Sequence, residues 1–140
     1  MYVKAVLIAI FIQVVLTFGL VLAAAILRRR ALGSGSVHPR DIALGQPNWP
    51  PRATQVANAF RNQFELPVLF YVLCILAIIT RQADYLFVIL AWLFVIFRLV
   101  HAYIHVTYNR ISHRGLAFAA GCVTLMLMWI VFAVDVLIGL

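Results

Sequence analysis

The chain has 140 residues, of which 66% are apolar and only 11% carry a charge. This composition excludes an ordinary soluble domain and is typical of a membrane protein, because there is too little polar surface to cover the apolar side chains. The net charge of +7 does not indicate nucleic-acid binding, because the basic residues stand at the ends of apolar runs, as membrane topology requires.

The first apolar run extends from Ala5 to Leu27 and predicts a transmembrane helix over about residues 5–27. It is too long for the core of a signal peptide, and it ends at three consecutive arginines, Arg28, Arg29 and Arg30. Residues 28–53 are rich in glycine and proline, which resist regular structure, so we expect a loop there.

A second helix is expected over about residues 54–80, beginning polar and becoming apolar without a break. Its polar residues recur at helical spacing and share one face: Thr54, Asn58, Arg61, Asn62 and Glu65. The apolar part, residues 66–80, covers about 22 Å, less than the roughly 30 Å of a hydrocarbon core. The preceding turns must therefore enter the edge of the bilayer with Arg61 and Glu65, where ionisable groups are costly.

The third and fourth helices are predicted over about residues 85–108 and 115–139, with a basic turn between them. The uncharged part of the third ends at Phe97, so this helix must continue through three polar positions. These are Arg98, His101 and His105, whose spacing of three and four places them on one face. The prediction is an all-α fold, an integral membrane four-helix bundle in a single domain.

The arginines set the expected orientation. Residues 28–53 carry Arg28, Arg29, Arg30, Arg40 and Arg52, and the turn before the fourth helix carries Arg110 and Arg114. The opposite side of the membrane would have only Lys4 and Arg81. The positive-inside rule therefore places both basic segments in the cytoplasm and both termini outside. A chain without long loops also suits a bacterial inner membrane.

The polar faces of the second and third helices are expected to lie at one depth. These helices are antiparallel neighbours, and counting from their short turn brings Glu65 level with Arg98 and His101 within about one helical turn. We expect Glu65 to pair with Arg98 or Arg61 in a cationic pocket that Arg114 approaches. Pro67 frees the carbonyl group of Gln63, so a local kink would widen the pocket.

Structural alternatives remain for the same charges. Arg61 and Glu65, spaced i,i+4, would neutralise each other on one helix, and Arg98 would extend to the lipid headgroups. Metal chemistry is not expected. His101 and His105 lie on one side of one helix and cannot ligate a haem iron from opposite faces, and no cysteine or carboxylate completes a metal site.

Two motifs resemble those of a known family. Arg61-Asn62-x-x-Glu65-x-Pro67 opens the second helix, and Arg98-x-x-His101-x-x-x-His105 is followed by Arg110 and Arg114. Together they resemble the MAPEG family, the membrane-associated proteins in eicosanoid and glutathione metabolism, in a bacterial-type member. The resemblance extends over essentially the whole chain, so residues 1–140 would form one MAPEG-like transmembrane domain.

The resemblance implies a homotrimer that binds glutathione between neighbouring subunits near the cytoplasmic side. By that resemblance Arg61, Asn62 and Glu65 would contact glutathione, and Arg98, His101 and His105 would line the same pocket, with Arg28, Arg29 and Arg30 as further contributors. Arg114 would be the catalytic residue. A thiol with a pKa of about 8.5 is mostly protonated at neutral pH, and a nearby cation favours the nucleophilic thiolate.

The chain departs from the family pattern at three positions. His105 stands where the family often has tyrosine, Asn58 stands where an arginine is frequent, and Gly115 stands where some members have a hydroxyl. The expected function is a membrane-bound, glutathione-dependent transferase or peroxidase, with glutathione as co-substrate and no metal. Its lipophilic electrophiles would enter from the bilayer. The alternative is a non-catalytic lipid-binding or scaffolding membrane protein of the same fold.

Overall fold

The computed structural model describes residues 2–139, and over that range it is built from helices, without strands. In chain order the elements are α1 (Val3–Gly33), η1 (Pro39–Asp41), α2 (Pro51–Arg61), η2 (Asn62–Phe64), α3 (Leu66–Ile79), α4 (Tyr85–Val106) and α5 (Ile111–Ile138). Counting Pro51–Ile79 as one rod, four helical rods in this range are long and apolar enough to cross a membrane. The predicted all-α bundle with four transmembrane helices is therefore confirmed.

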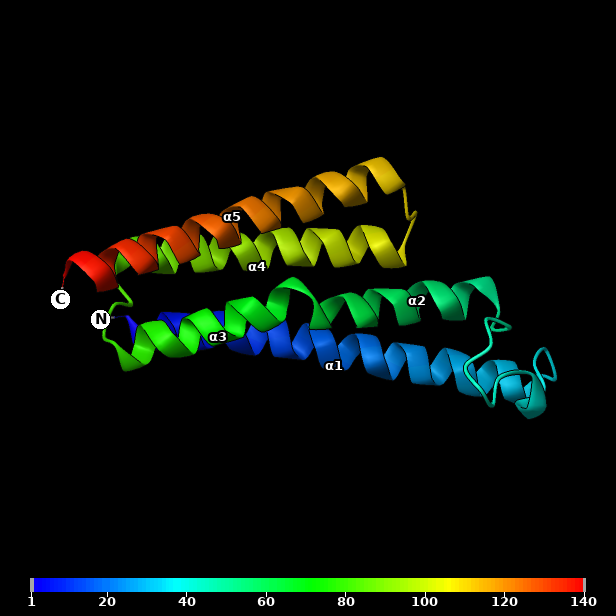
Figure 1. Ribbon diagram of the computed structural model, residues 1–140. Coiled ribbons are helices and arrows are strands. Elements are labelled where there is room, and N and C mark those ends of the chain that lie inside the picture. Colours follow the sequence, from blue (N-terminus) through cyan, green and yellow to red (C-terminus); the bar gives the residue numbers. More distant parts are fainter. Residues whose placement is uncertain (1, 140) are drawn as a thin grey trace.

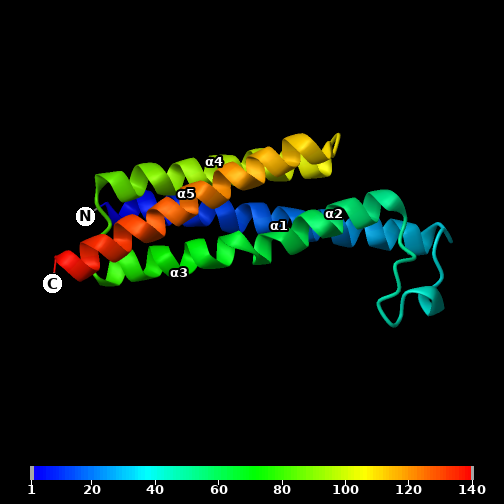
Figure 2. The same ribbon diagram turned by 45° about the horizontal axis from the view of Figure 1, so that its top comes forward.

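The rods lie side by side along one axis (Figure 1). Both ends of the chain lie beside the α3–α4 turn, and the loop after α1 lies at the opposite end with the α4–α5 turn. α1 packs against α2, α3 and α4, whereas α5 packs along α4 and reaches α3 near its C-terminal end (Figure 2). We call the end that holds residues 28–53 and 107–114 the basic end.

Two helix boundaries differ from those predicted. α1 runs through the three arginines to Gly33, because arginine, alanine and leucine all favour helix, and the Ser34 amide donates to the carbonyl of Arg30 at 2.9 Å. α5 begins at Ile111 rather than near Gly115. Arg114 therefore lies on the first turn of α5, where its direction is fixed by the helix.

The second rod is broken, so the prediction of one uninterrupted helix is wrong. α2 ends at Arg61, a 3₁₀ turn follows, and Glu65 has φ −96° and ψ −110°, which is not helical. The predicted kink before Pro67 is confirmed in position, because this proline has no N–H to donate to the carbonyl of Gln63. At this break, which lies at the depth of the motif residues, the backbone carbonyl of Asn62 accepts a hydrogen bond from a side chain of another helix.

The buried side chains are apolar at one end of the bundle and polar at the other. Toward the chain ends it is an apolar core, in which the rings of Phe70 and Phe94 stack with centroids 4.6 Å apart. Toward the basic end, buried polar side chains take over: Gln13, Gln63, Arg98, His101 and His105. The candidate site therefore lies in the basic half of the bundle, beside the helix break.

Candidate functional site

Asn62 links the second and third rods at the break. Nη2 of Arg98 donates to the backbone carbonyl of Asn62 at 3.2 Å and also to its side-chain Oδ1. The Asn62 amide Nδ2 donates to Oε2 of Glu65 at 2.7 Å. Arg98 is fully buried, with 0% of its surface exposed, whereas Glu65 is exposed. The result is a hydrogen-bonded chain that runs from a buried cation to an exposed carboxylate.

The predicted ion pairs of Glu65 with Arg98 or Arg61 are wrong. Among residues 2–139 the single ion pair joins Arg40 and Asp41, 3.8 Å apart. Asn62 stands between the two charges because the 3₁₀ turn brings its side chain and carbonyl against α4. The alternative that Arg98 extends to the headgroups is also wrong, because its guanidinium is enclosed by the bundle.

The two histidines of α4 present unpaired ring nitrogens. Nδ1 of His101 donates to the backbone carbonyl of Arg114 at 3.0 Å, since a carbonyl oxygen can only accept, and this leaves Nε2 of His101 buried without a partner. Nδ1 of His105 is also buried without a partner. The two rings meet edge to face with centroids 5.6 Å apart. Buried ring nitrogens without partners are available to a ligand.

Arg114 closes the same region from α5. Its Nη1 donates to Oδ1 of Asn109 at 2.7 Å, and Asn109 has φ 48°, a left-handed conformation that asparagine tolerates better than most residues. A hollow of about 270 Å³ lies between these groups. It is lined by Asn62, His101, His105, Ile111, Arg114, Gly115 and Phe118, and we call it the histidine hollow.

A known protein family matches most of the sequence that carries these residues. The sequence model of the MAPEG family matches residues 6–134. The chain belongs to the MAPEG family. It is therefore an integral multi-pass membrane protein of a family in glutathione and eicosanoid metabolism. No curated protein and no solved structure matches the chain significantly.

In this MAPEG protein neither Arg61 nor Arg98 is among the residues that line the histidine hollow with Arg114, which corrects the predicted cationic cluster. Consecutive residues of a helix point about 100° apart, so Arg61 and Asn62 face different flanks of the rod. Arg61 instead lines a second hollow of about 310 Å³ at the basic end, together with Arg28, Trp49, Thr54 and Asn58. We call this the arginine hollow.

Sequence reasoning missed two residues at or beside the histidine hollow. Phe118 lies one helical turn after Arg114, and its ring is 5.7 Å from that of His101, so the i,i+4 spacing was the available signal. Asn109 orients Arg114 through a turn conformation that no periodicity reveals. Among the described residues 2–139 there is also no group of three His, Cys, Asp or Glu side chains that would hold a metal ion.

Proposed function

We propose that this MAPEG protein is a glutathione-dependent transferase or peroxidase that acts on lipophilic electrophiles. The observation that carries the proposal is the histidine hollow, where unpaired nitrogens of His101 and His105 and the guanidinium of Arg114 converge beside Asn62. Convergent polar groups in one concave site are the usual mark of a ligand-binding site. The family match supports glutathione as the ligand.

The hollow fits the thiol-bearing part of glutathione better than the whole tripeptide. Its volume of about 270 Å³ is just below the range of ligand pockets, which begins at about 300 Å³. The exposed carboxylate of Glu65 would bind the glutathione ammonium group, and an arginine would bind a carboxylate, both through charge-assisted hydrogen bonds. A neighbouring subunit of the homotrimer that we propose would cover the remainder.

Conjugation by glutathione requires its thiol to be deprotonated to the thiolate. The guanidinium of Arg114 would stabilise the negative charge on sulfur, and the free Nδ1 of His105 would accept the hydrogen bond or the proton of the thiol. In conjugation the sulfur then forms a bond with an electrophilic carbon, and the leaving group departs with its electron pair. His105 would thus replace the tyrosine that the family often has at this position.

The topology we propose places the histidine hollow on the cytoplasmic side, with both termini outside, in a bacterial inner membrane. The basis is the distribution of arginines, which gather at the end of the bundle where the hollow lies. Glutathione would then arrive from the cytoplasm, and the lipophilic substrate from the hydrocarbon.

The proposal is tested by conjugation of glutathione to a reactive aromatic halide, measured on the purified protein in detergent. Arg114→Ala is expected to abolish turnover while the thermal unfolding midpoint stays within a few degrees of wild type. The matched control is Arg110→Ala, which removes an exposed arginine one turn earlier that lines neither hollow. Unchanged turnover in Arg114→Ala would reject the role in thiolate stabilisation.

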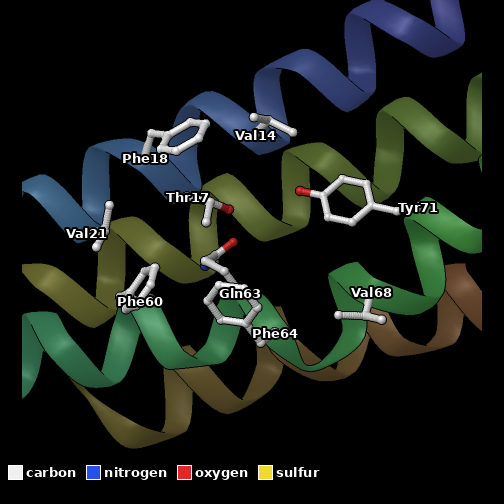
Figure 3. A pocket seen from close by; sticks show the side chains of 9 residues that line it. All are labelled: Val14, Thr17, Phe18, Val21, Phe60, Gln63, Phe64, Val68 and Tyr71. Atoms are coloured by element: carbon white, nitrogen blue, oxygen red, sulfur yellow. The ribbon is translucent and has the colours of Figure 1, made fainter.

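A non-catalytic lipid-binding function is the second candidate, because an apolar hollow of about 530 Å³ opens between α1 and the second rod (Figure 3). This candidate predicts no conjugation and no rise in unfolding temperature when glutathione is titrated. A glutathione-dependent rise that Asn62→Ala reduces and Asn58→Ala leaves intact would exclude it.

A further inference from the structure

Asn109 is a single residue that closes α4 and also binds a side chain of α5. Its backbone N–H donates to the carbonyl of Ile104 at 2.8 Å, which satisfies one of the last carbonyl groups of α4. Its side-chain Oδ1 accepts a hydrogen bond of 2.7 Å from Nη1 of Arg114, on the first turn of α5. Asn109 therefore ties the guanidinium of Arg114 to the end of the helix that carries His101 and His105.

The backbone conformation at this position restricts which residues can do this. Asn109 has φ 48°, in the left-handed region that asparagine tolerates better than most side chains. Glycine would adopt the same conformation without strain but has no oxygen to offer. Aspartate has the oxygen but adds a negative charge that would weaken the field of the Arg114 cation. Asparagine provides both the conformation and a neutral acceptor.

The side chain of Asn109 is not used to stabilise the start of α5. Asparagine is among the preferred capping residues, yet the capping position of α5 is Arg110, which makes no side-chain capping hydrogen bond. The oxygen of Asn109 instead binds Arg114. A cation in the first turn is itself disfavoured by the helix dipole. Both observations indicate that this corner holds the guanidinium in place rather than strengthening the helix.

The segment around Arg114 is fixed from two further directions. Nδ1 of His101 donates to the backbone carbonyl of Arg114 at 3.0 Å. From α2, Nε2 of Gln55 donates to the carbonyls of His105 and Thr107 at 2.8 and 3.1 Å, which fixes the end of α4 just before the turn to α5 (Figure 1). The backbone that carries the guanidinium is therefore held from α2 and α4, and Asn109 holds its far end.

We propose that Asn109 is a positioning residue that directs the guanidinium of Arg114 toward the sulfur of glutathione in the histidine hollow. The inference rests on the proposed function, and Asn109 itself is not among the residues that line the hollow. Asn109 occupies one N–H group of Arg114, and the remaining donors of the guanidinium stay available to a thiolate. A fixed cation stabilises the thiolate more than a mobile one, because the attraction falls with distance.

The expected effect depends on pH. A thiol with a pKa of about 8.5 is about one-tenth ionised at about pH 7.5 and about three-quarters ionised at about pH 9. Without a positioned cation, kcat is therefore expected to fall by up to about tenfold at the lower pH and by less than about twofold at the higher pH. The KM for glutathione is expected to stay within about twofold, because the groups that bind the peptide are unchanged.

Other ionisable groups do not confuse this comparison. The elements around the hollow carry Arg98, His101 and His105 on α4, Tyr108 in the turn, Arg110 and His113 at the start of α5, and Glu65 in the second rod. None of these side-chain types ordinarily titrates between about pH 7.5 and 9.

The experiment follows glutathione bound to the purified full chain, by the ultraviolet absorbance of the thiolate as the pH is raised, together with conjugation rates at the two pH values. Asn109→Gly keeps the left-handed backbone and removes the acceptor, and it is expected to raise the pH of ionisation by about one unit. Asn109→Ala is expected to give the same shift, with a lower unfolding temperature because alanine is strained at this φ. Tyr108→Phe is the matched control, because it removes a different hydrogen bond of the same turn, 3.1 Å from the hydroxyl to Nδ1 of His113.

Tyr108→Phe is expected to leave the thiol titration unchanged, and a shift equal to that of Asn109→Gly would show a merely structural role of the turn. In the Arg114→Ala background Asn109→Gly is expected to cause no further shift, since its effect passes through Arg114; a further shift would overturn the proposal. If wild type ionises bound glutathione and Asn109→Gly behaves identically, this inference alone fails. If wild type neither binds nor ionises glutathione, the proposed function fails, and this inference with it.

Discussion

Asn62 is the most informative position to perturb, because it is the acceptor for a fully buried arginine. In Asn62→Ala the guanidinium of Arg98 keeps the backbone carbonyl at position 62 but loses the side-chain acceptor, and Glu65 loses its donor. Nε and Nη1 of Arg98 already lack partners. A buried cation that loses one of its few acceptors has no water to replace it.

The expected loss of unfolding free energy depends on the charge of Arg98. A hydrogen bond to a charged group contributes about 1.5–3 kcal/mol, whereas hydrogen bonds between membrane helices average about 0.6 and reach about 1.7 kcal/mol. We expect Asn62→Ala to lower the free energy of unfolding by about 2–3 kcal/mol. The assay is reversible unfolding in mixed micelles with increasing dodecyl sulfate. Asn58→Ala is the control, since it removes an exposed amide one turn earlier and is expected to cost under about 0.5 kcal/mol.

The double variant tests the cause. Replacing a buried charge with an apolar side chain of similar volume is often neutral, so Arg98→Met is expected to cost less than Asn62→Ala. In the Arg98→Met background the Asn62→Ala change is expected to cost at least about 1 kcal/mol less than it does alone. Additive effects, or a cost of Asn62→Ala below about 0.6 kcal/mol, would refute the view that the buried charge governs this contact.

Two further variants probe the same half of the bundle. Gln13→Leu removes the 2.7 Å hydrogen bond from Nε2 of Gln13 to Oε1 of Gln63 and is expected to cost about 0.6–1.7 kcal/mol in the same unfolding assay, with a stabilised variant as the contradicting result. His105→Phe removes the unpaired Nδ1 and is expected to lower glutathione conjugation about 100-fold or more while the unfolding midpoint changes little; equal turnover of variant and wild type would exclude proton transfer at this residue.

Much of the fold was readable from the sequence, because apolar run length and basic flanks specify the four rods directly. The break at Asn62 was not readable as a break. The polar periodicity from Thr54 to Glu65 continues through it, and Pro67 indicated only a kink. Arg98 of α4 donates to the carbonyl of Asn62 within the break, and this contact joins residues far apart in sequence. The local sequence therefore indicated where the rod bends but not the contact made there.

The sequence predicted the depth of the motif residues along the bundle, but not how the second rod is rotated about its own axis. Counting residues from the α3–α4 turn placed the motif of the second helix level with that of the third, and the contact of Asn62 with Arg98 confirms the level. Which polar residue meets Arg98 depends on how the rod is turned, and one position changes the direction by about 100°. For this reason Arg61 was assigned to the wrong flank, and Asn62 rather than Glu65 receives the guanidinium.

The interrupted rod also constrains how the chain is inserted during biogenesis. α3 has 14 residues, and at about 1.5 Å each it rises about 21 Å, too little to cross the hydrocarbon alone. α4 in isolation would carry Arg98 into the bilayer at a cost of about 2.5–3.5 kcal/mol. The turns before Leu66 lengthen the second rod enough to cross the hydrocarbon. They also provide the acceptors on Asn62 that Arg98 of α4 needs. We therefore expect the two arms of the helical hairpin of residues 51–106 to enter the membrane together, as one unit of insertion.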